Sequence, residues 1–205
     1  MTPAQRMVEE LRLRGISDER VLAALLAVPR EEFVPPRYRS AAYEDTSLAI
    51  GCEQTISQPT VVAATLQAVA PEPDDRALEV GAGSGYVVAL LGQLCREVIG
   101  MERVPELAAS AQNRLRRLGV LNAEVLEGDG TAGAPGTDPF QVIVVSAAAD
   151  RVPPPLIARL ADGGRLAIPL AAGDGHEELT LFTKRGESLE GRVLFAVRFV
   201  PLIEG

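Results

Sequence analysis

Hydrophobic and polar residues change their pattern along the chain near Ala77. From there, short apolar runs alternate with helical stretches, which is the pattern of a parallel sheet covered on both faces. The predicted strands are Ala77–Val80, Glu97–Met101, Ala123–Leu126, Gln141–Val145 and Arg165–Pro169. The predicted helices are Tyr86–Leu94, Pro105–Leu118 and Pro155–Leu160. This order predicts an α/β, doubly wound, Rossmann-like fold.

The two ends of the chain follow other patterns. The first sixty residues predict helices and loops, with Ser17 as the expected N-cap of a helix that stops near Pro29. The stretch from Gly51 to Pro59 is too polar for a core strand, and a helical pattern follows it. After a turn at residues 173–175, two further strands are expected to be antiparallel. These are Leu179–Thr183 and Arg192–Val200.

The composition is that of a globular domain with a sizeable core. Of 205 residues, 47% are hydrophobic and 23% are charged. The 20 Lys and Arg residues against 28 Asp and Glu residues give a net charge of −8, which disfavours binding to the phosphate backbone of nucleic acids. Apolar runs such as Val61–Leu66 are too short to cross a membrane, and no export signal is visible.

Cysteine and histidine usage narrows the chemistry further. Cys52 and Cys95 form no C-x-x-C pair, so neither a disulfide framework nor a zinc site is expected. Two unpaired thiols fit a reducing cytoplasm, which is the expected location. His176 is the only histidine, and its acidic surroundings favour a solvated loop residue over a base or a metal ligand. No metal site is predicted.

The strongest local signal is a glycine loop between a predicted strand and a predicted helix. Gly81, Gly83 and Gly85 let a ligand approach the backbone closely. The dinucleotide fingerprint G-x-G-x-x-G has a third glycine at the position that Tyr86 occupies here. This difference disfavours NAD as the ligand. Glu79 suits a ligand that carries an ammonium group and a sulfonium, as S-adenosylmethionine does. The alternative is an ordinary glycine-rich turn.

Two acidic positions agree with a nucleoside ligand. Glu102 ends the second strand, 21 positions after Gly81, near the offset of about 20 residues at which an acid accepts from ribose hydroxyls. Asp129, in Gly128-Asp129-Gly130 after the third strand, can accept from an adenine amino group. Taken alone, each is also compatible with a solvated surface acid or a plain turn.

The chain lacks the sequence motifs of enzymes that methylate nucleic-acid bases, and it has polar residues that can orient a carboxylate. No Pro-Pro-aromatic sequence follows the fourth strand, and neither cysteine follows a proline. A carboxylate acceptor is already ionised at pH 7 and needs no general base. Neutral hydrogen-bonding groups at Gln54, Thr55, Ser57 and Gln58 can orient it without neutralising it. The competing interpretation is a helix-capping segment, with Ser57 or Thr60 as the cap.

The segment Gln54-Thr55-Ile56-Ser57-Gln58-Pro59, at its distance before the glycine loop, resembles the protein-L-isoaspartate O-methyltransferase family. Other segments are similar to that family in the same order. They are Leu78–Tyr86, Gly128–Gly130, Ala147–Ala149, Gly163–Leu166 and Arg198–Leu202. The similarity runs from about Arg6 to Leu202, which is nearly the whole chain.

The resemblance implies transfer of a methyl group from S-adenosylmethionine to the α-carboxylate of L-isoaspartyl residues in damaged proteins, followed by repair through a succinimide. By position, Ser57 is the catalytic serine, and Thr55, Ile56 and Val200 contact the substrate. The implied cofactor-binding residues are Glu79, Gly81, Gly83, Ser84, Glu102, Asp129 and Gly130. A monomer is expected, as one domain of residues 1–205. Within it, residues 1–70 form a helical substrate segment, 75–170 the cofactor-binding core and 171–205 the C-terminal strands.

Some positions depart from the family pattern. Glu53 stands where bacterial members usually have glycine, and it puts an acid near a site for a carboxylate. Gln141 replaces an aspartate, Ser146 a threonine and Asp150 a proline, and these changes look tolerable. Ile203 stands where some members have a threonine that contacts the cofactor, so that contact is not carried over. Three alternatives stay open: methylation of an aspartate side chain in a dedicated peptide, a cofactor-binding homologue without turnover, and an NAD-dependent reductase.

Overall fold

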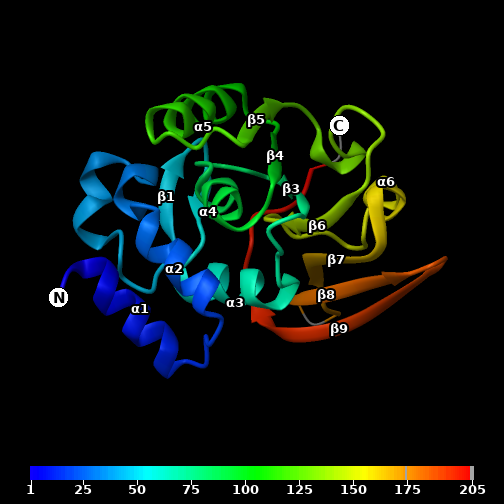
Figure 1. Cartoon of the computed structure of the whole chain (residues 1–205), viewed down its shortest axis with the longest axis horizontal. Helices are drawn as coiled ribbons and strands as arrows, with labels where there is room; N and C mark the ends of the chain where they lie inside the picture. The colour runs from blue at the N-terminus through cyan, green and yellow to red at the C-terminus, as the bar shows by residue number, and fades with distance from the viewer. Residues whose placement is uncertain (174, 204–205) are drawn as a thin grey trace.

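A computed structural model describes residues 1–173 and 175–203, and Figure 1 shows how the elements are arranged. The α-helices are α1 (Pro3–Leu13), α2 (Glu19–Ala27), α3 (Pro59–Val69), α4 (Tyr86–Leu94), α5 (Pro105–Arg117) and α6 (Pro154–Arg159). Short 3₁₀ helices are η1 (Arg30–Phe33), η2 (Pro36–Ala41) and η3 (Gly130–Ala132). The predicted turn at residues 173–175 lies partly outside the described residues.

The strands form one large mixed sheet and a separate hairpin. The hairpin strands are β1 (Leu48–Gly51) and β2 (Gln54–Ile56). The strands of the large sheet are β3 (Arg76–Val80), β4 (Glu97–Glu102), β5 (Ala123–Glu127), β6 (Phe140–Val145), β7 (Leu160–Ala171), β8 (Glu177–Arg185) and β9 (Ser188–Val197). Their order is β5-β4-β3-β6-β7-β8-β9.

The predicted fold is confirmed. Strands β3 to β7 pair in parallel, and β8 and β9 continue the sheet as antiparallel strands. In Figure 1 the N-terminal helices lie at one side of this sheet, while the β8–β9 hairpin extends from the other. Strand order reverses between β3 and β6, which is the place where doubly wound sheets bind ligands.

The structure corrects several local predictions. The polar stretch before α3 contains a strand, since β2 pairs with β1 as a hairpin where helices and loops were expected. Asp18, not Ser17, caps α2, because its carboxylate accepts from the amides of the first turn. Strand β7 begins at Leu160 rather than Arg165, with a bulge in its pairing to β6. Strand β9 ends at Val197 rather than Val200.

Apolar residues alternate along the central strands and so build a core on each face of the sheet. In β6, Val142 and Val144 pack with the N-terminal helices and α4, while Ile143 and Val145 pack with the α6 side. Burial on both faces explains the nearly continuous apolar runs that identified these strands. The N-terminal helices share the first core with the sheet, so they are part of the same packed unit.

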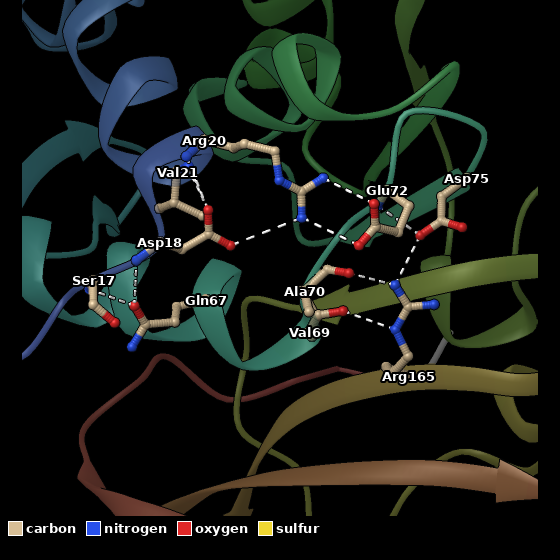
Figure 2. Close-up of polar contacts among 10 residues, drawn as sticks. All are labelled: Ser17, Asp18, Arg20, Val21, Gln67, Val69, Ala70, Glu72, Asp75 and Arg165. Carbon is tan, nitrogen blue, oxygen red and sulfur yellow. Dashed lines mark hydrogen bonds and ion pairs between the residues drawn. The ribbon is translucent and has the colours of Figure 1, made fainter.

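Arg165 on β7 ties the end of α3 to the sheet (Figure 2). Its Nε donates to the Val69 carbonyl at 2.8 Å and its Nη2 to the Asp75 carboxylate at 2.8 Å. The same guanidinium also donates to the carbonyl of Ala70. Exposed carbonyls at a helix C-terminus lack partners within the helix, so this arginine satisfies two of them.

The backbone of Ala70 predicts a stabilising substitution. Ala70 is exposed and adopts a left-handed conformation (φ 42°, ψ 65°) at the C-cap of α3. A Cβ costs about 1 kcal/mol in this region, and glycine avoids the cost. We expect Ala70→Gly to raise the melting temperature by about 2–4 °C, as measured by thermal unfolding. Ala68→Gly, inside α3, is the control and should lower it, because glycine there costs about 1 kcal/mol.

Candidate functional site

A cleft opens at the carboxyl ends of β3 and β6, where the strand order reverses. Every substrate or cofactor residue that the family resemblance implies lines it, although these residues come from five separate parts of the chain. They are Thr55, Ile56, Ser57, Glu79, Gly81, Gly83, Ser84, Glu102, Asp129, Gly130 and Val200. The structure therefore brings this set together in one place. Gln54 lines the cleft as well, whereas Gln58 and Gly85, which the sequence analysis also named, do not.

The glycine loop is held open by its backbone conformation and by Glu102. Gly81, Gly83 and Gly85 have φ values of 82°, 51° and 82°, and residues other than glycine adopt such backbone conformations only at an energetic cost. The Gly83 amide donates to Glu102 Oε2 at 2.7 Å, and the Val104 amide donates to Oε1 at 2.9 Å. Glu102 is only 5% exposed. Its carboxylate thus fixes the loop and still has lone pairs for ligand hydroxyls.

Asp129 and Gly130 form the next wall of the cleft. Asp129 Oδ1 accepts from the Thr131 amide at 2.9 Å and the Thr131 hydroxyl at 2.7 Å, so it caps η3. A Cβ at Gly130 would lie 2.6 Å from Cγ1 of Val80, which excludes larger residues. This glycine keeps the chain close to β3.

Glu79 places a deeply buried carboxyl group at the cleft. The residue is 2% exposed, and its Oε1 accepts from the Ser146 hydroxyl at 2.7 Å. Its Oε2 is buried without a hydrogen-bond partner. Burial raises the pKa of Glu79 to about 8, although the bond from Ser146 opposes the change. A buried acidic oxygen that lacks a partner and lines a cleft suits a cationic ligand group.

The polar segment before α3 forms the side of the cleft opposite the glycine loop. Strand β2 ends at Ile56, and Ser57 follows it directly. The helix-capping interpretation is wrong, since Gln58 is the N-cap of α3, and the Thr60 amide of the first turn donates to Asp45 Oδ1 at 2.9 Å and not to Ser57. Within the described chain, the Ser57 carbonyl accepts from Arg30 Nη2 at 2.6 Å, while no hydrogen bond engages its hydroxyl. That hydroxyl borders the cleft.

The C-terminal segment closes the rim. The Ala148 amide donates to the Val200 carbonyl at 2.8 Å, and the Leu202 amide donates to the Ala148 carbonyl at 2.6 Å. These bonds turn the chain after β9 back across the end of β6. Val200 reaches the cleft through this return rather than as part of the predicted strand.

Sequence reasoning missed several features of the site. The bond between Ser146 and Glu79 joins residues 67 positions apart, and no local pattern signals it. Ile203 lines the cleft even though its cofactor contact was not carried over. Nothing in the sequence marks Arg30 as a residue of the site, apart from its place in a largely apolar stretch. Glu53 lies on the exposed β1–β2 turn and outside the cleft lining.

The part of the chain that the structure describes contains neither a membrane-spanning helix nor a metal-binding cluster. No helix there is long and apolar enough to cross a membrane. No group of three or more His, Cys, Asp and Glu side chains there is placed to hold a metal ion. His176 is partly exposed, lies 3.8 Å from Glu178 and does not line the cleft.

Two solved structures share the architecture over nearly the whole chain. One, described as a protein-L-isoaspartate O-methyltransferase, is 30% identical with a TM-score of 0.90, and the match covers 98% of this chain and 66% of that one. The other, from Plasmodium falciparum in complex with S-adenosyl-L-homocysteine, is 27% identical with a TM-score of 0.87, and the match covers both chains fully. Fold and cleft together therefore define a Rossmann-like methyltransferase.

The family follows from the sequence matches. The family model "Protein-L-isoaspartate(D-aspartate) O-methyltransferase (PCMT)" matches residues 2–205. A protein-L-isoaspartate O-methyltransferase of Methanoregula boonei is 46% identical over 200 residues, which are 97% of this chain and 92% of the relative. One from a Bradyrhizobium species is 44% identical over 205 residues, 99% of this chain and 95% of the relative. The chain belongs to this family of enzymes, which confirms the resemblance stated above.

The pKa of Glu79 predicts how the stability of the free protein depends on pH. The pKa of Glu79 in the folded protein, about 8, lies above the ordinary value of 4.5. The contribution of this carboxyl group to the free energy of unfolding is therefore full below about pH 4.5 and is lost as the pH rises through 8. Glu79→Gln, neutral at every pH, lacks this loss. We expect wild type to lose stability relative to the variant by up to about 1.4 kcal/mol per pH unit in that window. Urea unfolding of both proteins measures it, and parallel pH curves would contradict it.

Proposed function

We propose that this chain transfers the methyl group of S-adenosylmethionine to the α-carboxylate of L-isoaspartyl residues in damaged proteins and peptides. The observation that carries the proposal is the composition of the cleft. Neutral donors at Thr55 and Ser57 form one side, and the buried acids Glu79 and Glu102 belong to the other. One side thus suits an anionic acceptor, and the other suits a cationic, hydroxyl-bearing cofactor.

The cofactor is S-adenosylmethionine, which supplies a methyl group on a positively charged sulfur. The residues that would hold it divide by chemistry. Glu79 offers its partnerless oxygen to the ammonium group, and Glu102 offers remaining lone pairs to the ribose hydroxyls. Gly81, Gly83 and Ser84 supply close backbone approach for the amino-acid part. Asp129 and Gly130 border the place for the adenine.

The acceptor side matches a nucleophile that needs no base. A carboxylate attacks the methyl carbon directly as the carbon–sulfur bond breaks, and the product is a methyl ester with a neutral thioether. Among the described residues that line the cleft there is no histidine, lysine or cysteine. Thr55 and Ser57 therefore act by orienting the carboxylate, with Ile56 and Val200 beside them to exclude water. The backbone amide nitrogen of the following residue then attacks the ester carbonyl and methanol leaves, and the resulting succinimide begins repair.

We further propose one domain with a division of roles: residues 1–70 for substrate, 75–170 for cofactor and 171–205 for the rim. A monomer is sufficient, because one chain supplies every wall of the cleft. Action in the cytoplasm is supported by two free thiols, with Cys52 exposed and Cys95 buried. The net charge of −8 supports protein substrates over nucleic acid.

The proposed activity predicts discrimination between two linkages. The purified protein is incubated with methyl-labelled S-adenosylmethionine and two peptides that differ only in an isoaspartyl or a normal aspartyl linkage. We expect base-labile methyl ester on the isoaspartyl peptide alone. Equal label on both peptides would instead support a dedicated aspartate side chain as acceptor. Label on neither peptide, despite binding of S-adenosylhomocysteine, would support a homologue without turnover.

Removal of the Ser57 hydroxyl tests its proposed catalytic role. A hydrogen bond to a charged group contributes about 1.5–3 kcal/mol, so Ser57→Ala should lower kcat/KM for the isoaspartyl peptide about ten- to hundredfold. Binding of S-adenosylhomocysteine, measured by calorimetry, should stay unchanged. Ser40→Ala, at an exposed position away from the cleft, is the matched control. Lost cofactor binding in Ser57→Ala would contradict a substrate-orienting role.

A further inference from the structure

A stack of two arginines and two aromatic rings, buried at Arg30, Tyr86 and Phe33 and partly exposed at Arg114, connects the two sides of the cleft. The guanidinium carbon of Arg30 lies 4.8 Å from the ring centroid of Tyr86. The Tyr86 ring lies 5.2 Å from that of Phe33, at an interplanar angle of 59°. The guanidinium carbon of Arg114 lies 5.6 Å from the Phe33 centroid. These separations are within the range of cation–π and aromatic contacts.

Each end of the stack holds a backbone carbonyl of the site. Arg30 Nη2 donates to the carbonyl of Ser57 at 2.6 Å. Arg114 Nη1 donates to the carbonyl of Ser84, in the glycine loop, at 2.7 Å. Ser57 belongs to the proposed substrate segment and Ser84 to the proposed cofactor loop. The stack therefore spans from one to the other.

The members of the stack alternate between two parts of the chain. Arg30 and Phe33 come from η1, in the N-terminal segment. Tyr86 opens α4, and Arg114 lies near the end of α5. Each ring or guanidinium thus contacts a residue from the other part. An interleaved arrangement resists sliding of the N-terminal segment against the glycine loop, because any shift breaks several contacts at once.

The burial of Arg30 is more than packing requires. The residue is 0% exposed, and its Nε donates to the Ala42 carbonyl at 2.8 Å. Its Nη1 is buried and has no hydrogen-bond partner among the described residues. Burial accordingly lowers the pKa of this guanidinium. A methionine would fill such a space without desolvating a charge, so the fork of donors that reaches Ser57 is the property that only arginine supplies.

We propose that Arg30 and Arg114 are positioning residues at the two ends of one stack, which sets the substrate segment and the cofactor loop relative to each other. Arg30 acts through the Ser57 backbone on the peptide, and Arg114 acts through the Ser84 backbone on the cofactor. This inference rests on the proposed function for its substrate end only.

Two dissociation constants distinguish the roles of Arg30 and Arg114. Calorimetry gives the Kd of S-adenosylhomocysteine and then the Kd of an isoaspartyl peptide on the loaded protein. Arg30→Met should weaken peptide binding by about tenfold and leave the S-adenosylhomocysteine Kd within about twofold. Arg114→Met should do the reverse. Arg30→Lys, which keeps the charge and one donor to Ser57, should recover part of the loss.

Two further variants decide between a connected stack and general destabilisation. Arg165→Met is the control, because Arg165 also donates to backbone carbonyls, those of Val69, Ala70 and Gln141, but lies away from the cleft; unlike Arg30, it also pairs with Asp75. It should lower the melting temperature and leave both binding constants unchanged. Phe33→Leu removes the central ring and should weaken both ligands.

Three outcomes would overturn the inference. They are unchanged constants in both Arg30→Met and Arg114→Met, equal weakening by Arg165→Met, and unchanged constants in Phe33→Leu. Wild type that binds no isoaspartyl peptide would refute the proposed function instead. In that case the proposed role of the stack is tested only by the Kd of S-adenosylhomocysteine for Arg114→Met and Phe33→Leu.

Discussion

Because strand order reverses between β3 and β6, the connections that follow these two strands leave in opposite directions and a cleft remains between them. The other features of the site depend on this separation. The chain after β3 must turn at once into α4, which requires the left-handed glycines of the loop. The chain after β6 places Ser146 against Glu79 and gives the C-terminal return a backbone to pair with at Ala148.

The cleft is surrounded by buried charges, and each is balanced differently. Leaving an ion buried and unpaired costs several kcal/mol, more than the 0.5–1.5 kcal/mol (approximately) that a typical hydrogen bond contributes. Glu102 is balanced by two backbone amides, and Arg30 by two carbonyls and a ring. Glu79 has one hydroxyl and instead retains a proton up to about pH 8. A cationic ligand beside the partnerless oxygen of Glu79 would favour the ionised carboxylate and so lower the pKa of this group.

The sequence predicted the sheet well because apolar alternation on both faces is a local signal. Glycine spacing and the resemblance then located the residues that line the cleft. The β1–β2 hairpin escaped prediction because its strands are three and four residues long and partly polar. Its two-residue turn, Cys52-Glu53, has left-handed φ values of 51° and 59°, which usually call for asparagine and glycine. The bonds of Arg30 join residues 12 and 27 positions apart, and no periodicity encodes such contacts.

Glu53 lies in the turn at the tip of this hairpin, and the magnitudes decide what its charge does to an anionic substrate. The side chain is exposed, so its repulsion of a carboxylate at 4 Å would be about 1 kcal/mol in water, and less at greater distance or in salt. Under the proposed function, hydrogen bonds from Thr55 and Ser57 to that carboxylate would be worth about 1.5–3 kcal/mol each. On that proposal the donors outweigh the acid, and Glu53 would reduce affinity without changing the class of acceptor. Its left-handed backbone explains why glycine is the residue that fits this position best.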